Sequence, residues 1–192
     1  FDPAVTEVMN FACGTGLMDK DIAPHAKRIV GVDISQGMVD AYNKRAAALN
    51  LNGKMSASVV HLTGSDPTEL NGSKFDLILC TMAYHHFSSV SIITSMLASF
   101  LKPGGWLLVT DLRTPPTDSS QPISGPAPEF DKIIVEKHGF SDDVGTSLFR
   151  NAGLEEVSMQ DVPGAILDGA VFGQPDNQRQ IFLLKGRKPE AK

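Results

Sequence analysis

Residues 8–16 read Val8-Met9-Asn10-Phe11-Ala12-Cys13-Gly14-Thr15-Gly16, a short apolar run that stops at a glycine-rich turn. Apolar runs of this length, bounded by turn residues, are typical of buried strands. Glycine lets the backbone pass close to a ligand, and the start of a following helix directs free N–H groups at it. A helix is expected from about Leu17 to Ala26, shortened by Pro24. The stretch therefore predicts a strand, a turn that can hold a ligand, and a helix.

The same alternation continues along the chain. Further strands are predicted at Arg28–Val32, Val59–Leu62, Phe75–Cys80, Trp106–Thr110, Leu154–Val162 and Gln178–Gly186. Further helices are predicted after Ser35, with Met38, Tyr42, Ala46 and Leu49 at helical spacing, and at Ser88–Leu101 and Ser141–Ala152. The pattern predicts an α/β fold, a doubly wound and mostly parallel seven-stranded sheet whose last two strands form an antiparallel pair.

Composition fits one globular domain. The chain has 192 residues, 42% of them hydrophobic and 20% charged, with a mean hydropathy of -0.05. We treat 1–192 as a single domain, in which a segment at 114–140 with a proline-rich start is expected to cover the substrate. The formal charge of -5 is a poor match for nucleic acid. No apolar window approaches the roughly 18 residues of a membrane span, so no membrane partner is expected.

Two cysteines, Cys13 and Cys80, lie far apart in the sequence. They form no metal-ligand spacing and no disulfide framework, so no metal is expected. Their number favours a reducing compartment, and we expect a cytoplasmic protein. Nothing in the sequence indicates the oligomeric state.

Ligands of open parallel sheets bind beyond the carboxyl ends of the strands. Here these are the segments just after Phe11, Val32, Leu62, Cys80 and Thr110. The functional residues are therefore expected in these five segments.

Asp33 ends the second strand, 19 residues after Gly14. A carboxylate at this place can accept both hydroxyls of a ribose, as in dinucleotide sites. The alternative, an Asp that caps the next helix, is weakened because Ser35 can fill that role. A dinucleotide turn also requires a third small residue, but the pattern from Gly14 passes Gly16 and reaches Asp19. A nucleoside without phosphates therefore fits better than a diphosphate.

Four further stretches accompany residues 8–16. They are Gly31-Val32-Asp33-Ile34-Ser35, Gly64-Ser65-Asp66, Phe75–His86 and Leu101-Lys102-Pro103-Gly104-Gly105-Trp106-Leu107. Together and in this order, the five stretches resemble the motifs of class I S-adenosylmethionine-dependent methyltransferases. The resemblance covers roughly residues 5 to 112. It implies the Rossmann-like methyltransferase fold and S-adenosyl-L-methionine as cofactor.

The resemblance also implies roles for single residues. The methionine part of the cofactor would lie on the turn, the ribose on Asp33, and the adenine near Ile34, Met38 and Asp66. The implied cofactor-binding set is Asn10, Ala12, Cys13, Gly14, Thr15, Gly16, Asp33, Ile34, Met38, Ser65, Asp66, Thr81 and Met82.

Three departures from the family pattern stand out. The family usually has an acidic residue where Asn10 stands and glycine where Ala12 stands. Asn10 cannot supply charge to the cofactor's amino group, whereas Ala12 adds a methyl group only. The family also has one or two helices before the first strand, which here begins within a few residues of Phe1, so we expect this chain to lack them.

His85 and His86 follow the fourth strand on the ligand side, and are the candidates for a catalytic base. Adjacent side chains point in different directions, so at most one of them is expected to face a substrate. Asp111 and His138 are weaker candidates for the substrate side.

The resemblance implies methyl transfer to an O, N, C or S atom. Thr81-Met82-Ala83-Tyr84 replaces the Asn-Pro-Pro-aromatic motif of enzymes that methylate exocyclic amino groups, and no Pro-Cys pair is present for cytosine chemistry. A small organic substrate is therefore favoured, with protein and RNA still open. Two other functions also stay open: a non-catalytic cofactor-binding module and a nicotinamide-dependent oxidoreductase.

Overall fold

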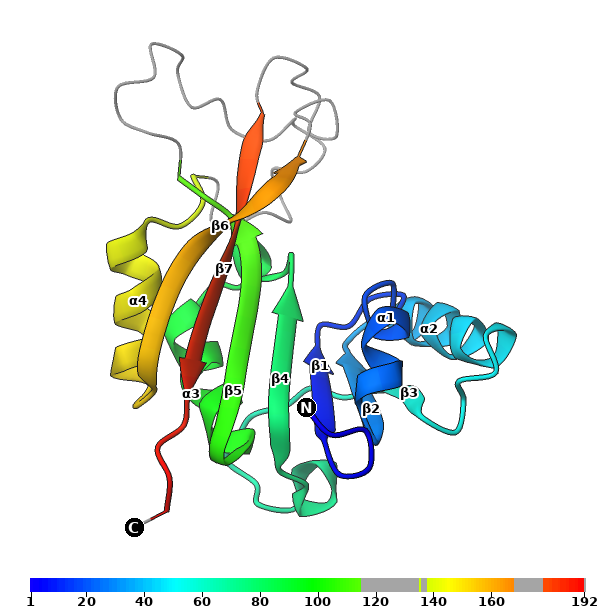
Figure 1. The fold of residues 1–192 in the computed structure, drawn as a ribbon. Coiled ribbons are helices and arrows are strands. Elements are labelled where there is room, and N and C mark those ends of the chain that lie inside the picture. The colour runs from blue at the N-terminus through cyan, green and yellow to red at the C-terminus, as the bar shows by residue number, and fades with distance from the viewer. Residues whose placement is uncertain (115–134, 136–137, 168–177, 192) are drawn as a thin grey trace.

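Seven strands form one sheet within residues 1–114, 135, 138–167 and 178–191, the part of the chain that the computed structural model describes (Figure 1). The strands are β1 (Glu7–Phe11), β2 (Arg28–Asp33), β3 (Met55–Val59), β4 (Phe75–Thr81), β5 (Leu101–Leu112), β6 (Glu155–Leu167) and β7 (Arg179–Arg187). Their order is β3-β2-β1-β4-β5-β7-β6. β7 runs antiparallel to both β5 and β6, and the other neighbouring pairs are parallel. The predicted α/β fold with an antiparallel terminal strand pair is confirmed.

Helices cover the two halves of the sheet. They are α1 (Asp19–Ile22), α2 (Gln36–Ala48), α3 (Val90–Phe100) and α4 (Asp142–Asn151), and three short 3-10 helices lie at Ala23–His25, Glu69–Gly72 and Tyr84–His86. α1 and α2 lie beside β1–β3, and α3 and α4 lie beside β5–β7 (Figure 1). Ser35 caps α2 as expected, because its hydroxyl accepts a hydrogen bond from the backbone N–H of Met38.

β4 shows why the central strands are almost continuously apolar. Leu77 and Leu79 belong to the buried cluster built around α2 and β1–β3, whereas Ile78 and Cys80 belong to the cluster on the α3 and α4 side. Successive side chains of a strand point to opposite faces, so a strand with both faces covered is apolar at every position. Each fully buried apolar side chain stabilises the fold by about 1.5–3 kcal/mol.

The third strand lies four residues earlier than predicted. β3 spans Met55–Val59, not Val59–Leu62. Met55 and Ala57 are buried, whereas the serines between and after them are exposed. β3 is an edge strand covered on one face, so its buried and exposed residues alternate. The mostly apolar residues 59–62 were therefore a misleading signal.

Other details also differ from the prediction. The first helix is only α1 followed by the 3-10 turn Ala23–His25, because Pro24 lacks the N–H that an α-helix would use there. In α2 the buried residues are Val39, Tyr42 and Ala46, whereas Met38 and Leu49 are each 45% exposed. β5 already starts at Leu101. The expected turn at 102–105 is an irregularity inside this strand, between Leu101 and Trp106, which both pair with residues of β4.

The segment that we expected to cover the substrate, 114–140, lies mostly outside the described residues. At its described ends, the backbone N–H of Thr114 donates to the carbonyl of Phe140, and Phe140 forms an isolated bridge with Arg113. The first and last residues of this stretch are therefore anchored beside β5.

Candidate functional site

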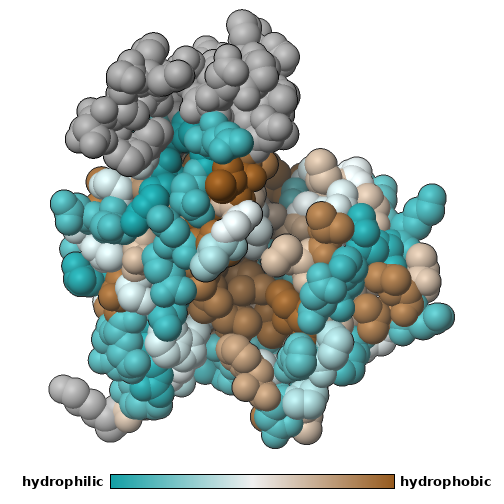
Figure 2. All heavy atoms as spheres, turned by 45° about the horizontal axis from the view of Figure 1, so that its top comes forward, coloured by the Kyte–Doolittle hydropathy of each residue, from teal (hydrophilic) through white to brown (hydrophobic). Residues whose placement is uncertain are grey.

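A cavity of about 870 Å³ opens at the carboxyl ends of the parallel strands. Hydrophobic surface gathers in a hollow on this face of the molecule (Figure 2). The cavity is lined by Asn10–Thr15, Leu17, Met18, Val32, Asp33, Ile34, Ser35, Met38, Val60, Thr81, Met82, Ala83, His86, Phe87, Thr110, Val162, Ala165 and Ile181. The segments after Phe11, Val32 and Cys80 thus meet at one site as predicted. The strand ends near Leu62 and Thr110 contribute only Val60 and Thr110.

The turn after β1 has the backbone conformation that glycine favours. The φ angle is +52° at Gly14 and +72° at Gly16. A Cβ atom at Gly16 would lie 2.6 Å from Cδ2 of Tyr42, whereas a Cβ atom at Gly14 would meet no heavy atom within 4 Å. Gly16 is therefore required by packing against α2, while Gly14 leaves open space beside the cavity.

Ala12 differs from the expectation in one respect. Its φ angle is +54°, in the left-handed region. An L-residue in this region costs about 1–2 kcal/mol. The departure from glycine therefore strains the backbone in addition to adding a methyl group, and the strain lies at a residue that lines the cavity.

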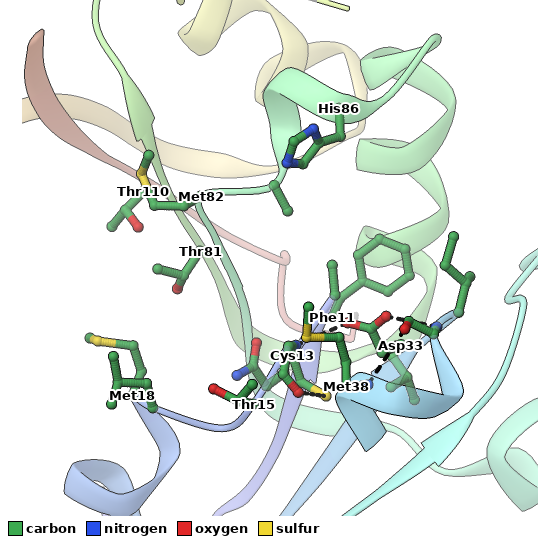
Figure 3. Close-up of a pocket in the computed structure, with 18 of the residues that line it drawn as sticks. Phe11, Cys13, Thr15, Met18, Asp33, Met38, Thr81, Met82, His86 and Thr110 are labelled. Carbon is green, nitrogen blue, oxygen red and sulfur yellow. Dashed lines mark hydrogen bonds between the residues drawn. The ribbon is translucent and has the colours of Figure 1, made fainter. Parts of the chain in front are cut away.

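Asp33 ties the first two loops together. Its Oδ2 accepts a hydrogen bond from the backbone N–H of Gly14 at 2.9 Å, and its Oδ1 accepts one from Ser35 at 2.9 Å. A carboxylate has about four acceptor positions, so each oxygen can accept one more hydrogen bond. Asp33 thus fixes the turn and still offers acceptors to a ligand, while Ser35 caps the helix. Asp33, Cys13 and Thr15 lie at one end of the cavity, and His86 lies at the other (Figure 3).

Asn10 is bound to a buried carboxylate that the sequence analysis did not assign to the site. Its Nδ2 donates to Oδ1 of Asp19 at 2.8 Å, and the hydroxyl of Tyr42 donates to Oδ2 of Asp19 at 2.5 Å. Burial raises the pKa of Asp19 above its ordinary value, against the opposing effect of these two hydrogen bonds. Oδ1 of Asn10 is buried and has no hydrogen-bond partner.

Cys13 lines the same end of the cavity. Burial, and then the charges of Asp33 and Asp19, raise the pKa of its thiol to about 12. The thiol therefore stays protonated at neutral pH, and Cys13 is a packing residue rather than a nucleophile.

The two histidines after β4 have different surroundings. His85 is buried, and its Nδ1 lies 2.8 Å from Oδ1 of Asp111, which is itself fully buried. His86 lines the cavity, and its ring lies 4.0 Å from that of His85. Of the two histidines, of which at most one was expected to face a substrate, only His86 lines the cavity. Because His85 and Asp111 hold each other beneath the site, neither is placed to contact a substrate.

Thr81 and Met82 also line the cavity, as the resemblance implied. Met82 has a φ angle of +52°, and its backbone N–H donates to the carbonyl of Thr110 at 2.8 Å. A second strained residue therefore lies at this site, at the end of β4.

Ser65 and Asp66 lie outside the cavity lining. The oxygens of Asp66 are used locally, since Oδ1 accepts from the backbone N–H and the hydroxyl of Thr68. These bonds hold the pKa of Asp66 below its ordinary value. Asp66, which precedes Pro67, therefore holds the local turn, a common role for aspartate.

Several residues that line the cavity were not predicted from the sequence. Val162, Ala165 and Ile181 come from β6 and β7, and Phe87 packs against Phe11 with ring centroids 5.7 Å apart. Apolar residues in apolar strands carry no signal that distinguishes a lining position from a core position. Asp19, which lies behind Asn10 and not in the lining, did carry a signal, because a carboxylate stands there at the place of the third small residue of a dinucleotide turn.

The described residues contain no group of three or more histidine, cysteine or acidic side chains that could hold a metal ion. None of the helices in this part of the chain is long and apolar enough to cross a membrane.

Comparison with known proteins agrees with this geometry. The family model "Methyltransferase domain" matches residues 9–109, from β1 to β5. The uncharacterized methyltransferase C1347.09 of Schizosaccharomyces pombe is 35% identical over 158 residues, which are 79% of this chain and 54% of that protein. The chain spans about half the length of the curated relatives that it matches.

Solved structures share the fold at low sequence identity. The [4+2]-cyclase SpnF has a TM-score of 0.74 at 18% identity, with 100% of this chain and 78% of SpnF covered. Phosphoethanolamine N-methyltransferase 2 of Haemonchus contortus, solved in complex with S-adenosyl-L-methionine, has a TM-score of 0.67 at 13% identity, with 97% and 49% covered. The sheet order and the cavity at its strand ends define a Rossmann-like methyltransferase fold. The chain belongs to the methyltransferase domain family.

Proposed function

We propose that this chain binds S-adenosyl-L-methionine in the cavity and transfers its methyl group to an O, N, C or S atom of a small organic molecule. The observation that carries the proposal is the charge of the cavity. Among its described lining residues Asp33 is the only carboxylate, and there is no lysine or arginine. A dinucleotide would need cations, or a turn with a third small residue, to hold its diphosphate, whereas a positively charged sulfonium needs neither.

The residues at the Asp33 end fit the cofactor. The free acceptor positions of Asp33 suit two ribose hydroxyls. The open space beside Gly14 lets a ligand approach the backbone of the turn, where the methionine part would lie. The orphaned oxygen of Asn10 suits a donor such as an ammonium group. Ile34 and Met38 line the cavity and are 76% and 45% exposed, so they offer apolar surface to an adenine ring.

The adenine contact that the resemblance assigned to Ser65 and Asp66 is not part of this proposal. Val60, which follows β3 and lines the cavity, is the nearest described residue of that segment to the site. The proposed adenine site is therefore apolar, formed by Ile34, Met38 and Val60.

The other end of the cavity would receive the methyl acceptor. Most residues that line the cavity are apolar, which excludes water and favours an uncharged organic molecule. The bound cofactor supplies an electrophilic methyl group. The chain would align the acceptor, and His86 would take a proton from an acceptor that must lose one.

Methyl transfer can be tested without knowing the acceptor. The chain is incubated with a metabolite extract and S-adenosyl-L-methionine carrying a deuterated methyl group, and products are sought by their mass shift. We expect one or a few labelled small molecules, absent with Asp33→Ala. Equilibrium binding of S-adenosylhomocysteine without any labelled product would indicate a non-catalytic module, and preferential binding of NADH would indicate an oxidoreductase.

The role of His86 has a separate test. Once an acceptor is known, His86→Gln is expected to lower kcat by about 10²–10⁴-fold for an acceptor that must lose a proton. The affinity for S-adenosylhomocysteine should stay the same, because His86 lies at the opposite end of the cavity from Asp33 (Figure 3). An unchanged kcat would remove His86 from the mechanism.

A cytoplasmic location is also proposed. It is supported by the two cysteines, which are both free and buried.

A further inference from the structure

Asp19 is a buried carboxylate for which no charged partner is present in the described structure. Its relative exposure is 0%, and its two oxygens accept from Nδ2 of Asn10 and from the hydroxyl of Tyr42. It thereby joins the start of α1, the end of β1 and the middle of α2. Burying a charge without a cation beside it is unfavourable in free energy, so the presence of Asp19 at this place needs an explanation.

The hydrogen bonds of Asp19 fix the orientation of the Asn10 amide. An ionised carboxylate only accepts hydrogen bonds, so it selects the NH₂ side of the amide and turns Oδ1 away from itself. Asn10 lines the cavity, and this Oδ1 is buried without a donor. An orphaned buried acceptor is unfavourable, and this cost is recovered when a donor arrives.

The site therefore presents an acceptor oxygen with a negative charge directly behind it. The amide of Asn10 carries no charge, but Asp19 lies one hydrogen bond further, at 2.8 Å from Nδ2. A charge-assisted hydrogen bond polarises the amide and makes Oδ1 a better acceptor for a cationic donor. An ammonium group, which has three donors and one positive charge, matches this arrangement.

We propose that Asp19 is a positioning residue that, through Asn10, binds the ammonium group of the cofactor's methionine part. The inference rests on the proposed cofactor but not on any methyl acceptor. Asp19 does not touch the ligand in this account. It orients the Asn10 amide and supplies the negative charge, and Tyr42 holds it in place.

Asp19→Asn tests the charge with little change in shape. An asparagine can still accept from Nδ2 of Asn10 with its oxygen and donate to the hydroxyl oxygen of Tyr42 with its NH₂ group. Asp21→Asn is the matched control, since Asp21 lies on the same short helix, is 69% exposed at its side chain and pairs with Lys20.

Comparing two ligands distinguishes an effect of Asp19 on ammonium binding from a general effect on the folded structure. S-adenosylhomocysteine carries the ammonium group, whereas 5′-methylthioadenosine has the same nucleoside without the amino-acid part. We expect Asp19→Asn to weaken calorimetric binding of S-adenosylhomocysteine about tenfold or more, and that of 5′-methylthioadenosine less than about twofold. Asp21→Asn should change neither.

The double variant Asn10→Asp with Asp19→Asn moves the carboxylate to position 10. We expect it to restore the preference for S-adenosylhomocysteine. Equal weakening of both ligands by Asp19→Asn would reduce Asp19 to a structural role and overturn the proposal. Unchanged binding of both ligands would overturn it too. If the unaltered chain bound neither ligand, the proposed cofactor would fail together with this inference.

Discussion

Gly16→Ala tests the packing on which the turn after β1 depends. A Cβ atom there would lie 2.6 Å from Cδ2 and 2.7 Å from Cε2 of Tyr42. Tyr42 cannot swing aside easily, because it is fully buried and its hydroxyl is bonded to Asp19. Overpacking of this kind costs about 1–3 kcal/mol, and a left-handed alanine adds about 1–2 kcal/mol. We expect the free energy of unfolding to fall by about 2–5 kcal/mol.

Gly14→Ala is the matched control for this measurement. Gly14 has a similar φ angle of +52°, but nothing lies within 4 Å of the added Cβ. It should lose only the backbone contribution of about 1–2 kcal/mol. Urea unfolding of both variants, compared with the unaltered chain, isolates the steric part as their difference. Equal losses would mean that Tyr42 does not pack against the turn in solution, and would refute the reasoning.

Two other substitutions examine the same end of the cavity. Asp33→Ala should abolish S-adenosylhomocysteine binding in calorimetry while leaving the far-UV circular dichroism spectrum largely unchanged; unchanged affinity would refute the ribose assignment. Ala12→Gly should raise the free energy of unfolding by about 0.5–1 kcal/mol, since relief of left-handed strain exceeds the entropy cost of glycine; a loss of stability would contradict the strain.

The pKa of Asp19 is raised by burial, so the folded state binds its proton more tightly than the unfolded state does. Stability from this group is complete below the ordinary value of 3.8 and is lost as pH rises through the folded pKa. Thermal unfolding of the unaltered chain and Asp19→Asn from about pH 7 to about pH 4 should therefore show the unaltered chain gaining relative stability on acidification. Cys13, Asn10 and Tyr42 face Asp19 and are the same in both proteins; a relative loss would contradict the sign.

Much of the fold follows from local patterns in the sequence. β1, β2 and β4 were predicted to within one residue, because both faces are covered and their apolar runs stop at glycine, aspartate or a polar loop. The prediction for β3 was wrong because serines alternate with its buried residues. This gives a weaker hydrophobic pattern than the mostly apolar residues 59–62 that follow. The order in which strands pair at the sheet edge depends on contacts between residues far apart in the sequence, which a short stretch of sequence does not contain.

The site could be predicted only where a single residue type is required. Gly14 and Gly16 were predicted because the backbone conformation of the turn restricts the residue type, and Asp33 because of its place at the end of β2, where it bonds to Gly14. The division of labour between His85 and His86 could not be found, since it depends on Asp111, which comes from another strand and captures one of two adjacent rings. The same holds for Asn10 and Asp19, whose connection requires β1 and α1 to be in place.

A crystal structure of the chain with S-adenosylhomocysteine would test the account most directly. We predict that the ribose hydroxyls will lie within hydrogen-bonding distance of the Asp33 carboxylate, with the amino-acid part along the turn from Ala12 to Gly14. A ligand bound at any other place on the protein, or a ribose held without Asp33, would contradict the account.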